Sequence, residues 1–140
     1  MSLADRLMQP MLHRITMNRW NYTDEEMSKA EKLGLFAALD WKAMSYWIVA
    51  DPVCSVHCAG CHNEGRPLYF SAMGTLIRRK CPPNICIHGL SQLSPIIYSY
   101  YDHLLQGRDP NDMVFNHATC TDIGLQMGGM GQNLFRVTRE

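Results

Sequence analysis

The pattern of apolar residues changes at Asp51-Pro52, and this change constrains the fold more than any other feature of the sequence. Residues before it repeat apolar side chains at the spacing of a helix, whereas residues after it form short apolar runs separated by Gly, Pro and Cys. Helices that precede a set of short strands are typical of the α+β class. The sequence therefore predicts N-terminal helices followed by a small antiparallel sheet with one or two packed helices.

The first 50 residues are expected to be helical. Apolar side chains recur at helical spacing over Leu3–Arg19, and a second helix starts at the capping box Thr23-Asp24-Glu25-Glu26. We expect this second helix to continue to Asp51-Pro52, with Gly34 as a point where it can split. Its apolar residues cover two faces, so it is expected to be buried on both, within the fold or against another subunit. A homo-oligomer that forms through this helix is the expected assembly.

Residues 51–140 are expected to form the Cys-rich α+β segment of a single domain that covers residues 1–140. Cys54–Arg66 has the composition of a loop. Met73-Gly74 is typical of a hairpin turn, Ser94-Pro95 of a helix start and Gly107 of a helix end. The expected elements are strands at 68–72, 75–79, 113–119 and 133–138, helices at 85–93 and 94–106, and a glycine-rich loop at 124–131.

The charge balance excludes several classes of partner. The chain has 140 residues with 13 basic and 13 acidic side chains, so its formal net charge is zero. Nucleic-acid-binding proteins carry a basic excess or stripe, so a nucleic-acid partner is not expected. The longest apolar stretch, Leu33–Ala50, is interrupted by Asp40 and Lys42, so a membrane span is not expected either. No leader is visible at the start, which favours a cytoplasmic protein, and the absence of net charge favours self-association.

The strongest chemical signal is the run Cys54-Ser-Val-His-Cys58-Ala-Gly-Cys61-His62. Its three thiols lie close enough in sequence to converge on one ion or cluster, and thiolates are soft ligands that suit Zn²⁺, Fe–S and Cu(I). Cys81 or Cys86 would supply a fourth ligand. The sequence therefore predicts a Cys-ligated centre, either a [4Fe–4S] cluster or zinc. A cluster would serve electron transfer, redox sensing or a larger enzyme as an accessory subunit, whereas zinc held by four thiolates would be structural.

The same run contains Cys58-Ala-Gly-Cys61-His62, which matches the attachment pattern of a c-type haem. In that alternative the two thiols bond the porphyrin edge and His62 is an axial ligand. Met127 or Met130 would supply the opposite ligand. The four surplus cysteines count against a haem protein.

A third possibility is a cysteine-dependent enzyme that acts on a small amide- or carboxylate-bearing substrate. His117, Cys120 and Asp122 provide an imidazole, a thiol and a carboxylate within six residues. On a regular strand His117 and Cys120 point to opposite faces, so this site needs a turn that begins near Ala118. The glycines that follow would let backbone amides face an oxyanion.

The second part of the chain also resembles a family of short, uncharacterised bacterial proteins that are common in anaerobes. The resemblance covers residues 67–139 and rests on Cys86-Ile-His88-Gly-Leu90, Leu93-Ser-Pro95, Gly107, Cys120-Thr-Asp122 and Phe135-Arg-Val137-Thr-Arg139. Members usually have Cys-Pro-Asp at the position of Cys120-Thr-Asp122, and they lack the helical segment before residue 50. The family has no established activity. The resemblance implies an α+β domain in which Cys86, Cys120 and Asp122 lie near one another.

Overall fold

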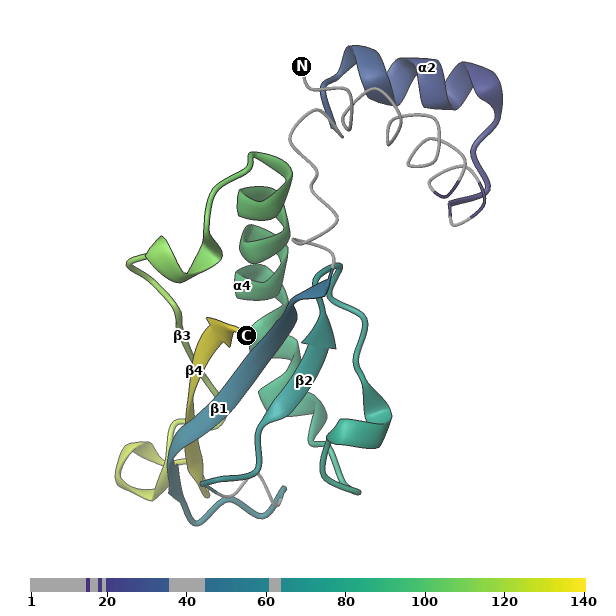
Figure 1. Ribbon diagram of the computed structural model, residues 1–140. Helices are drawn as coiled ribbons and strands as arrows, with labels where there is room; N and C mark the ends of the chain where they lie inside the picture. Colours follow the sequence, from purple (N-terminus) through teal and green to yellow (C-terminus); the bar gives the residue numbers. More distant parts are fainter. Residues whose placement is uncertain (1–14, 16–17, 19, 36–44, 61–63) are drawn as a thin grey trace. The chain divides into compact units, whose positions relative to one another are not determined.

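The fold is described for residues 15, 18, 20–35, 45–60 and 64–140 of a computed structural model (Figure 1). The chain divides into two units, Met1–Ala38 and Leu39–Glu140. The helix predicted over Leu3–Arg19 lies almost wholly outside the described residues. The second unit carries the sheet and confirms the predicted α+β class with an antiparallel sheet and a packed helix.

In the first unit, helix α2 (Asp24–Lys32) starts at the predicted capping box. The backbone N–H of Glu26 donates to Thr23 Oγ1 at 3.3 Å, and the backbone N–H of Thr23 donates to Glu26 Oε2 at 2.8 Å. The hydrogen bonds that Thr23 donates to the carboxylate of Glu26 hold the pKa of Glu26 below its usual value. The helix buries Met27 and Ala30 and ends before Gly34, which has a left-handed φ of 71°. The predicted continuation over residues 36–44 lies outside the described residues.

The second unit is a four-stranded antiparallel sheet in the order β2-β1-β4-β3. Its strands are β1 (Trp47–Val56), β2 (Leu68–Ser71), β3 (His117–Thr119) and β4 (Gln132–Arg139). β1 and β4 form the long central pair, with Ala50 opposite Val137 and Ser55 opposite Asn133. The predicted strands 68–72 and 133–138 are therefore confirmed.

The prediction that residues up to Asp51 are helical is wrong from Trp47 onwards. Trp47–Val56 is strand β1, in which Ile48, Val49, Ala50 and Pro52 are all buried. Bulky and β-branched residues favour a strand, and this short apolar run satisfies the period of a strand as well as that of a helix. The register shifts between Pro52 and Cys54, which accommodates the missing N–H of proline at a bulge. Cys54 is consequently part of this strand rather than of a loop.

Helix α4 (Ile87–Leu105) is continuous, whereas the sequence predicted two helices separated at Ser94-Pro95. Pro95 lies inside the helix, where a proline costs about 3 kcal/mol. Leu93, Ile97, Tyr100 and Leu104 nevertheless keep one buried stripe in phase on both sides of it. Each such side chain gains about 1.5–3 kcal/mol on full burial, which outweighs the proline. The predicted helix end is confirmed, because Gly107 follows with a left-handed φ of 68°.

Two predicted strands are shorter than expected. The second strand of the hairpin at 75–79 is reduced to one bridge between Phe70 and Leu76, followed by the 3-10 helix η1 (Arg78–Lys80). The guanidinium of Arg78 donates to the carbonyl oxygens of Pro82 and Pro83, which bends the chain away from the sheet. The strand predicted at 113–119 forms only over β3, after the 3-10 helix η2 (Pro110–Asp112).

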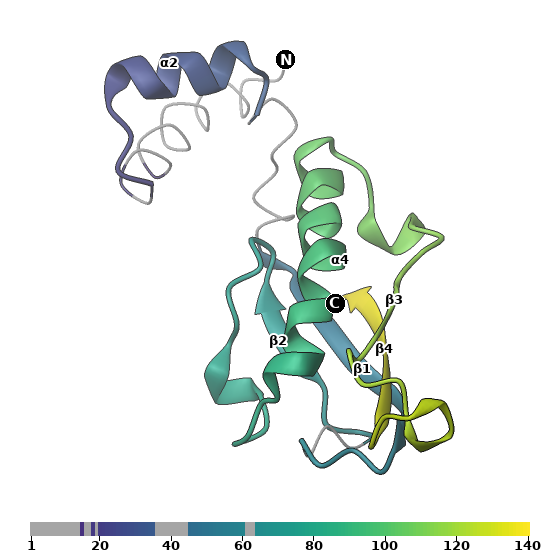
Figure 2. The same ribbon diagram turned by 180° about the vertical axis from the view of Figure 1, so that it is seen from behind.

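The core lies between α4 and one face of the sheet, as the view from behind shows (Figure 2). Tyr100 is fully buried there, and its hydroxyl donates to the carbonyl oxygen of Val137 at 2.6 Å. Burial, with a smaller effect from the charge of Asp109, raises the pKa of Tyr100 to about 12. The buried cluster consists of Ile48, Ala50, Leu68, Phe70, Leu93, Ile97, Tyr100, Ala118, Phe135 and Val137.

Candidate functional site

The glycine-rich loop is held in one shape by the carboxylate of Asp122. Oδ1 accepts the backbone N–H of Gly124 at 3.1 Å and of Met130 at 2.9 Å, and Oδ2 accepts that of Gly131 at 2.9 Å. These bonds, led by the one from Gly131, keep the pKa of Asp122 below its usual value. A Cβ on Gly129 would lie 2.1 Å from Asp122 Oδ1, so only glycine fits there. Asp122 is therefore an anchor of the loop, which also contains the 3-10 helix η3 (Leu125–Met127).

Cys120 lies beside this anchor, at the end of edge strand β3. The backbone N–H of Asp122 points at Cys120 Sγ at 3.5 Å, and the N–H of Cys120 donates to the carbonyl oxygen of Asn133 at 2.8 Å. Asn133 is buried, and its amide nitrogen donates to Ser55 Oγ at 3.4 Å. The half-buried thiol of Cys120 is thus fixed at the end of the sheet where β1, β4 and β3 lie side by side.

The N-terminal end of α4 meets the same corner of the sheet. Cys86 occupies the N-cap position of α4 and is half-buried. Two residues into the helix, the carbonyl oxygen of His88 accepts Thr121 Oγ1 at 3.2 Å, and Gln92 donates to that hydroxyl at 3.3 Å. Cys86 and Cys120 are each within two residues of this junction. The expected proximity of the Cys86, Cys120 and Asp122 side chains, which rests on the resemblance, stays a prediction.

The segment after β1 also reaches this corner. An ideal Cβ on Gly131 would lie 2.5 Å from the carbonyl oxygen of His57 and 3.3 Å from the Cα of Cys58, so these backbones are in direct contact. His57 has a left-handed φ of 52°, which turns the chain back toward the sheet. Glu64 Oε1 accepts the backbone N–H of Ser55 at 3.3 Å, which joins the two ends of the segment that carries Cys58 and Cys61. In Figure 1 this segment, the glycine-rich loop and the start of α4 lie at the same end of the sheet.

Cys54 and Cys81 are placed apart from this corner. Pro52 is opposite Phe135, on the face that α4 covers, whereas Cys54 is opposite Leu134, so the exposed Cys54 thiol belongs to the other face. Cys81 lies at the outer edge of β2, where its Sγ accepts the backbone N–H of Tyr69 at 3.3 Å. Tyr69 pairs with Val49, and the strand from Val49 to Cys54 is roughly 15 Å long.

Within the described ranges, no three His, Cys, Asp or Glu side chains are grouped closely enough to hold a metal ion. Cys61 and His62 lie outside those ranges, so the predicted ligand set of Cys54, Cys58 and Cys61 and the predicted haem attachment stay predictions. Of the two proposed fourth ligands, the fold brings Cys86 to the corner that Cys58 reaches and leaves Cys81 at the edge of β2.

The three residues of the predicted enzyme site are not assembled as a triad. His117 is exposed and opposite Arg136, on the face away from the buried Ala118. The pKa of Asp122 is lowered mainly by its backbone hydrogen bonds, with a smaller electrostatic effect from His88 rather than from His117.

Sequence reasoning did not single out Asn133 and Ser55. Asn133 alternates with Phe135 and Val137 along β4, so a polar residue on the buried face was the signal available for it. Ser55 has no comparable signal, because its strand was predicted to be a loop.

The described part of the chain contains no helix whose apolar run is long enough to span a bilayer. Comparisons with protein-family models, with curated proteins and with solved structures found no match to this chain. The resemblance of residues 67–139 to the anaerobe family stays a prediction.

Proposed function

We propose that this protein binds a soft metal centre, zinc or an iron–sulfur cluster, through thiolates at the corner formed by the β1 turn, the glycine-rich loop and the start of α4. The observation that carries the proposal is a continuous series of contacts that joins three cysteine-bearing segments: Cys58 to Gly131, Gly131 to Asp122 beside Cys120, and Thr121 to His88 beside Cys86. Cys58, Cys86 and Cys120 on these segments are half-buried, and thiolates are the donors that zinc and iron–sulfur centres use.

The proposed ligands are Cys58, Cys61, Cys86 and Cys120. Cys58 and Cys61 are three positions apart in sequence, on a segment whose ends are joined by the hydrogen bond between Ser55 and Glu64. Cys86 and Cys120 are fixed by secondary structure, whereas the Cys58 segment is a loop, so metal binding would draw the loop toward the two fixed thiols. Cys54 lies on the opposite face and is left out of this set.

The test is metal analysis of the full chain purified without oxygen. We expect one zinc or four irons per chain, and loss of most of that metal in Cys86→Ser and Cys120→Ser. Cys81→Ser and Cys54→Ser are the matched controls and keep the metal. A wild-type chain that holds no metal after reconstitution with zinc or with iron and sulfide refutes the proposal. Metal loss in the two controls but not in the other variants refutes this ligand set.

A second candidate is a thiol-dependent enzyme with Cys120 as nucleophile, and the backbone N–H of Asp122 that points at Cys120 Sγ supports it. Iodoacetamide labelling followed by mass spectrometry separates the two functions. A metal ligand is protected until a chelator removes the metal, whereas a nucleophile reacts at the same rate with and without chelator.

A further inference from the structure

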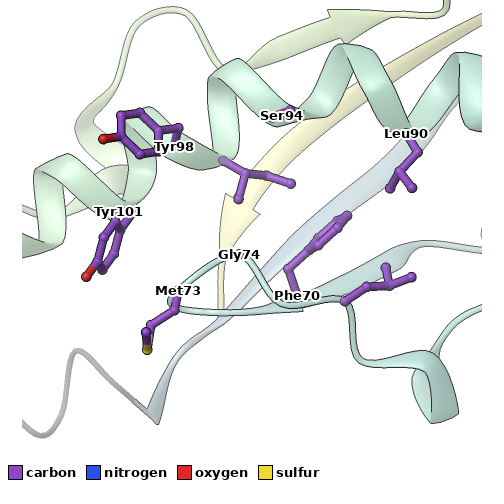
Figure 3. A pocket seen from close by; sticks show the side chains of 9 residues that line it. Phe70, Met73, Gly74, Leu90, Ser94, Tyr98 and Tyr101 are labelled. Carbon is purple, nitrogen blue, oxygen red and sulfur yellow. The ribbon is translucent and has the colours of Figure 1, made fainter. Parts of the chain in front are cut away.

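A pocket of about 320 Å³ lies between α4 and the turn that follows β2, on the side of the unit away from β3 (Figure 3). The rings of Tyr98 and Tyr101 bound one side of it, Phe70 and Leu90 bound the other, and Met73 lies on the turn. Ser94, which is on α4, also lines the pocket. The pocket contains none of the residues proposed to bind metal.

Part of the pocket lining belongs to the hydrophobic core, so the pocket does not depend on a ligand to form. Phe70 and Ile97 in its lining are only 3% and 7% exposed, and both belong to the buried cluster under α4. The turn is held close to the helix at Gly74, where φ is 82° and an added Cβ would lie 3.0 Å from Cγ2 of Ile97. Ligand sites are usually preformed in this way.

The lining selects against charge. None of its nine residues is acidic or basic, and most of the surface is aromatic or aliphatic. Figure 3 shows the hydroxyl oxygens of Tyr98 and Tyr101 at the ends of the rings that are farther from Phe70 and Leu90. Burying an ion here would have no compensating partner, whereas an aromatic ring would gain edge and face contacts.

The volume sets the size of the ligand. An engineered apolar cavity of roughly 150 Å³ binds benzene, and this pocket has about twice that volume. From the volume, the uncharged lining and the aromatic side chains in it, we propose that the pocket binds an uncharged aromatic molecule of about two rings.

The test is a fluorescence titration of the full chain with 1-naphthylamine, an uncharged two-ring probe. We expect saturable binding of one probe per chain. Ser94→Trp puts a large side chain at the pocket and should weaken binding at least tenfold. Ser91→Trp is the matched control, because Ser91 is an exposed serine on the same helix and does not line the pocket, and it should bind like the wild type.

Three results would overturn the proposal. Non-saturating fluorescence would indicate adsorption to exposed apolar surface. Equal affinity of Ser94→Trp and the wild type, with circular dichroism confirming that both are folded, would place the probe elsewhere. An anionic analogue, 5-aminonaphthalene-1-sulfonate, that binds as tightly as the uncharged probe would contradict the selection against charge.

Discussion

Gly131→Ala should weaken binding at the proposed metal centre without changing a thiol. The added Cβ would lie 2.5 Å from the carbonyl oxygen of His57, about 0.9 Å inside an ordinary contact of 3.4 Å, so the backbone of His57 and Cys58 must move by about that distance. Metal–ligand distances tolerate shifts of only about 0.2 Å. We therefore expect metal affinity to fall by about 10–100-fold, the loss typical when the support of a ligand is removed.

The assay is a competition titration with a chromogenic zinc chelator, beside urea unfolding of the metal-free chain. Gly131→Ala should also lose about 1–3 kcal/mol of unfolding free energy, because the contact is overpacked. Gly128→Ala is the control: at a φ of 88° it strains the same loop by about 1–2 kcal/mol, but its Cβ meets nothing within 4 Å. If both variants lose affinity equally, loop strain alone explains the effect and the reasoning is refuted. Wild-type affinity in Gly131→Ala refutes it as well.

Three further outcomes are expected. Pro95→Ala should stabilise the chain by about 2 kcal/mol in urea unfolding. The change removes a helix penalty of about 3 kcal/mol, but it also gives the unfolded chain more conformational freedom, which costs about 1 kcal/mol. An unchanged urea midpoint would contradict this. The pKa of Tyr100 is raised to about 12, so its neutral form contributes stability that is present below pH 10 and lost as the pH rises toward 12. Tyr100→Phe should therefore flatten the decline of the urea midpoint between pH 9 and 11. Parallel declines in the variant and the wild type would contradict this. The pKa of Asp109 is lowered chiefly by its hydrogen bond with Arg139, so this bond contributes stability above about pH 4 that is lost at lower pH. Asp109→Asn should therefore show a smaller difference between its urea midpoints at pH 5 and pH 3 than the wild type shows.

The class of the fold and several boundaries in residues 68–139 could be predicted, because local signals there agree with the tertiary structure. Gly107 ends α4, and the alternation of Asn133, Phe135 and Val137 predicts a buried strand. Two of the errors arose where packing overrides a local signal. At Trp47–Val56 the apolar run fits either period, and pairing with β4 decided for a strand. At Pro95 the stripe packed on the sheet outweighed the usual effect of proline on a helix.

The candidate site was predictable only in part. Spacing identified the cysteine-rich segment, because ligands close in sequence produce a visible pattern. Spacing contains no information on whether Cys81 or Cys86 returns to that segment, since both follow the same hairpin. The structure adds only their positions: Cys81 lies beside Tyr69 of β2, and Cys86 lies near the hydrogen bond between Thr121 and His88, which are 33 positions apart. The sequence also contains no sign that the carboxylate of Asp122 accepts three backbone N–H groups and so anchors the glycine-rich loop.

The position of β4 affects how this unit is assembled during synthesis. β4 is the last of the four described strands to leave the ribosome, yet among these strands it alone pairs with β3, and it is the longer partner of β1. Until residues 132–139 have emerged, the sheet has only the β1–β2 pair, and an isolated pair of strands is marginally stable at best. Nascent chains halted before Gln132 should therefore be cut rapidly by proteases and refold slowly, because the pairing that completes the sheet joins distant parts of the sequence.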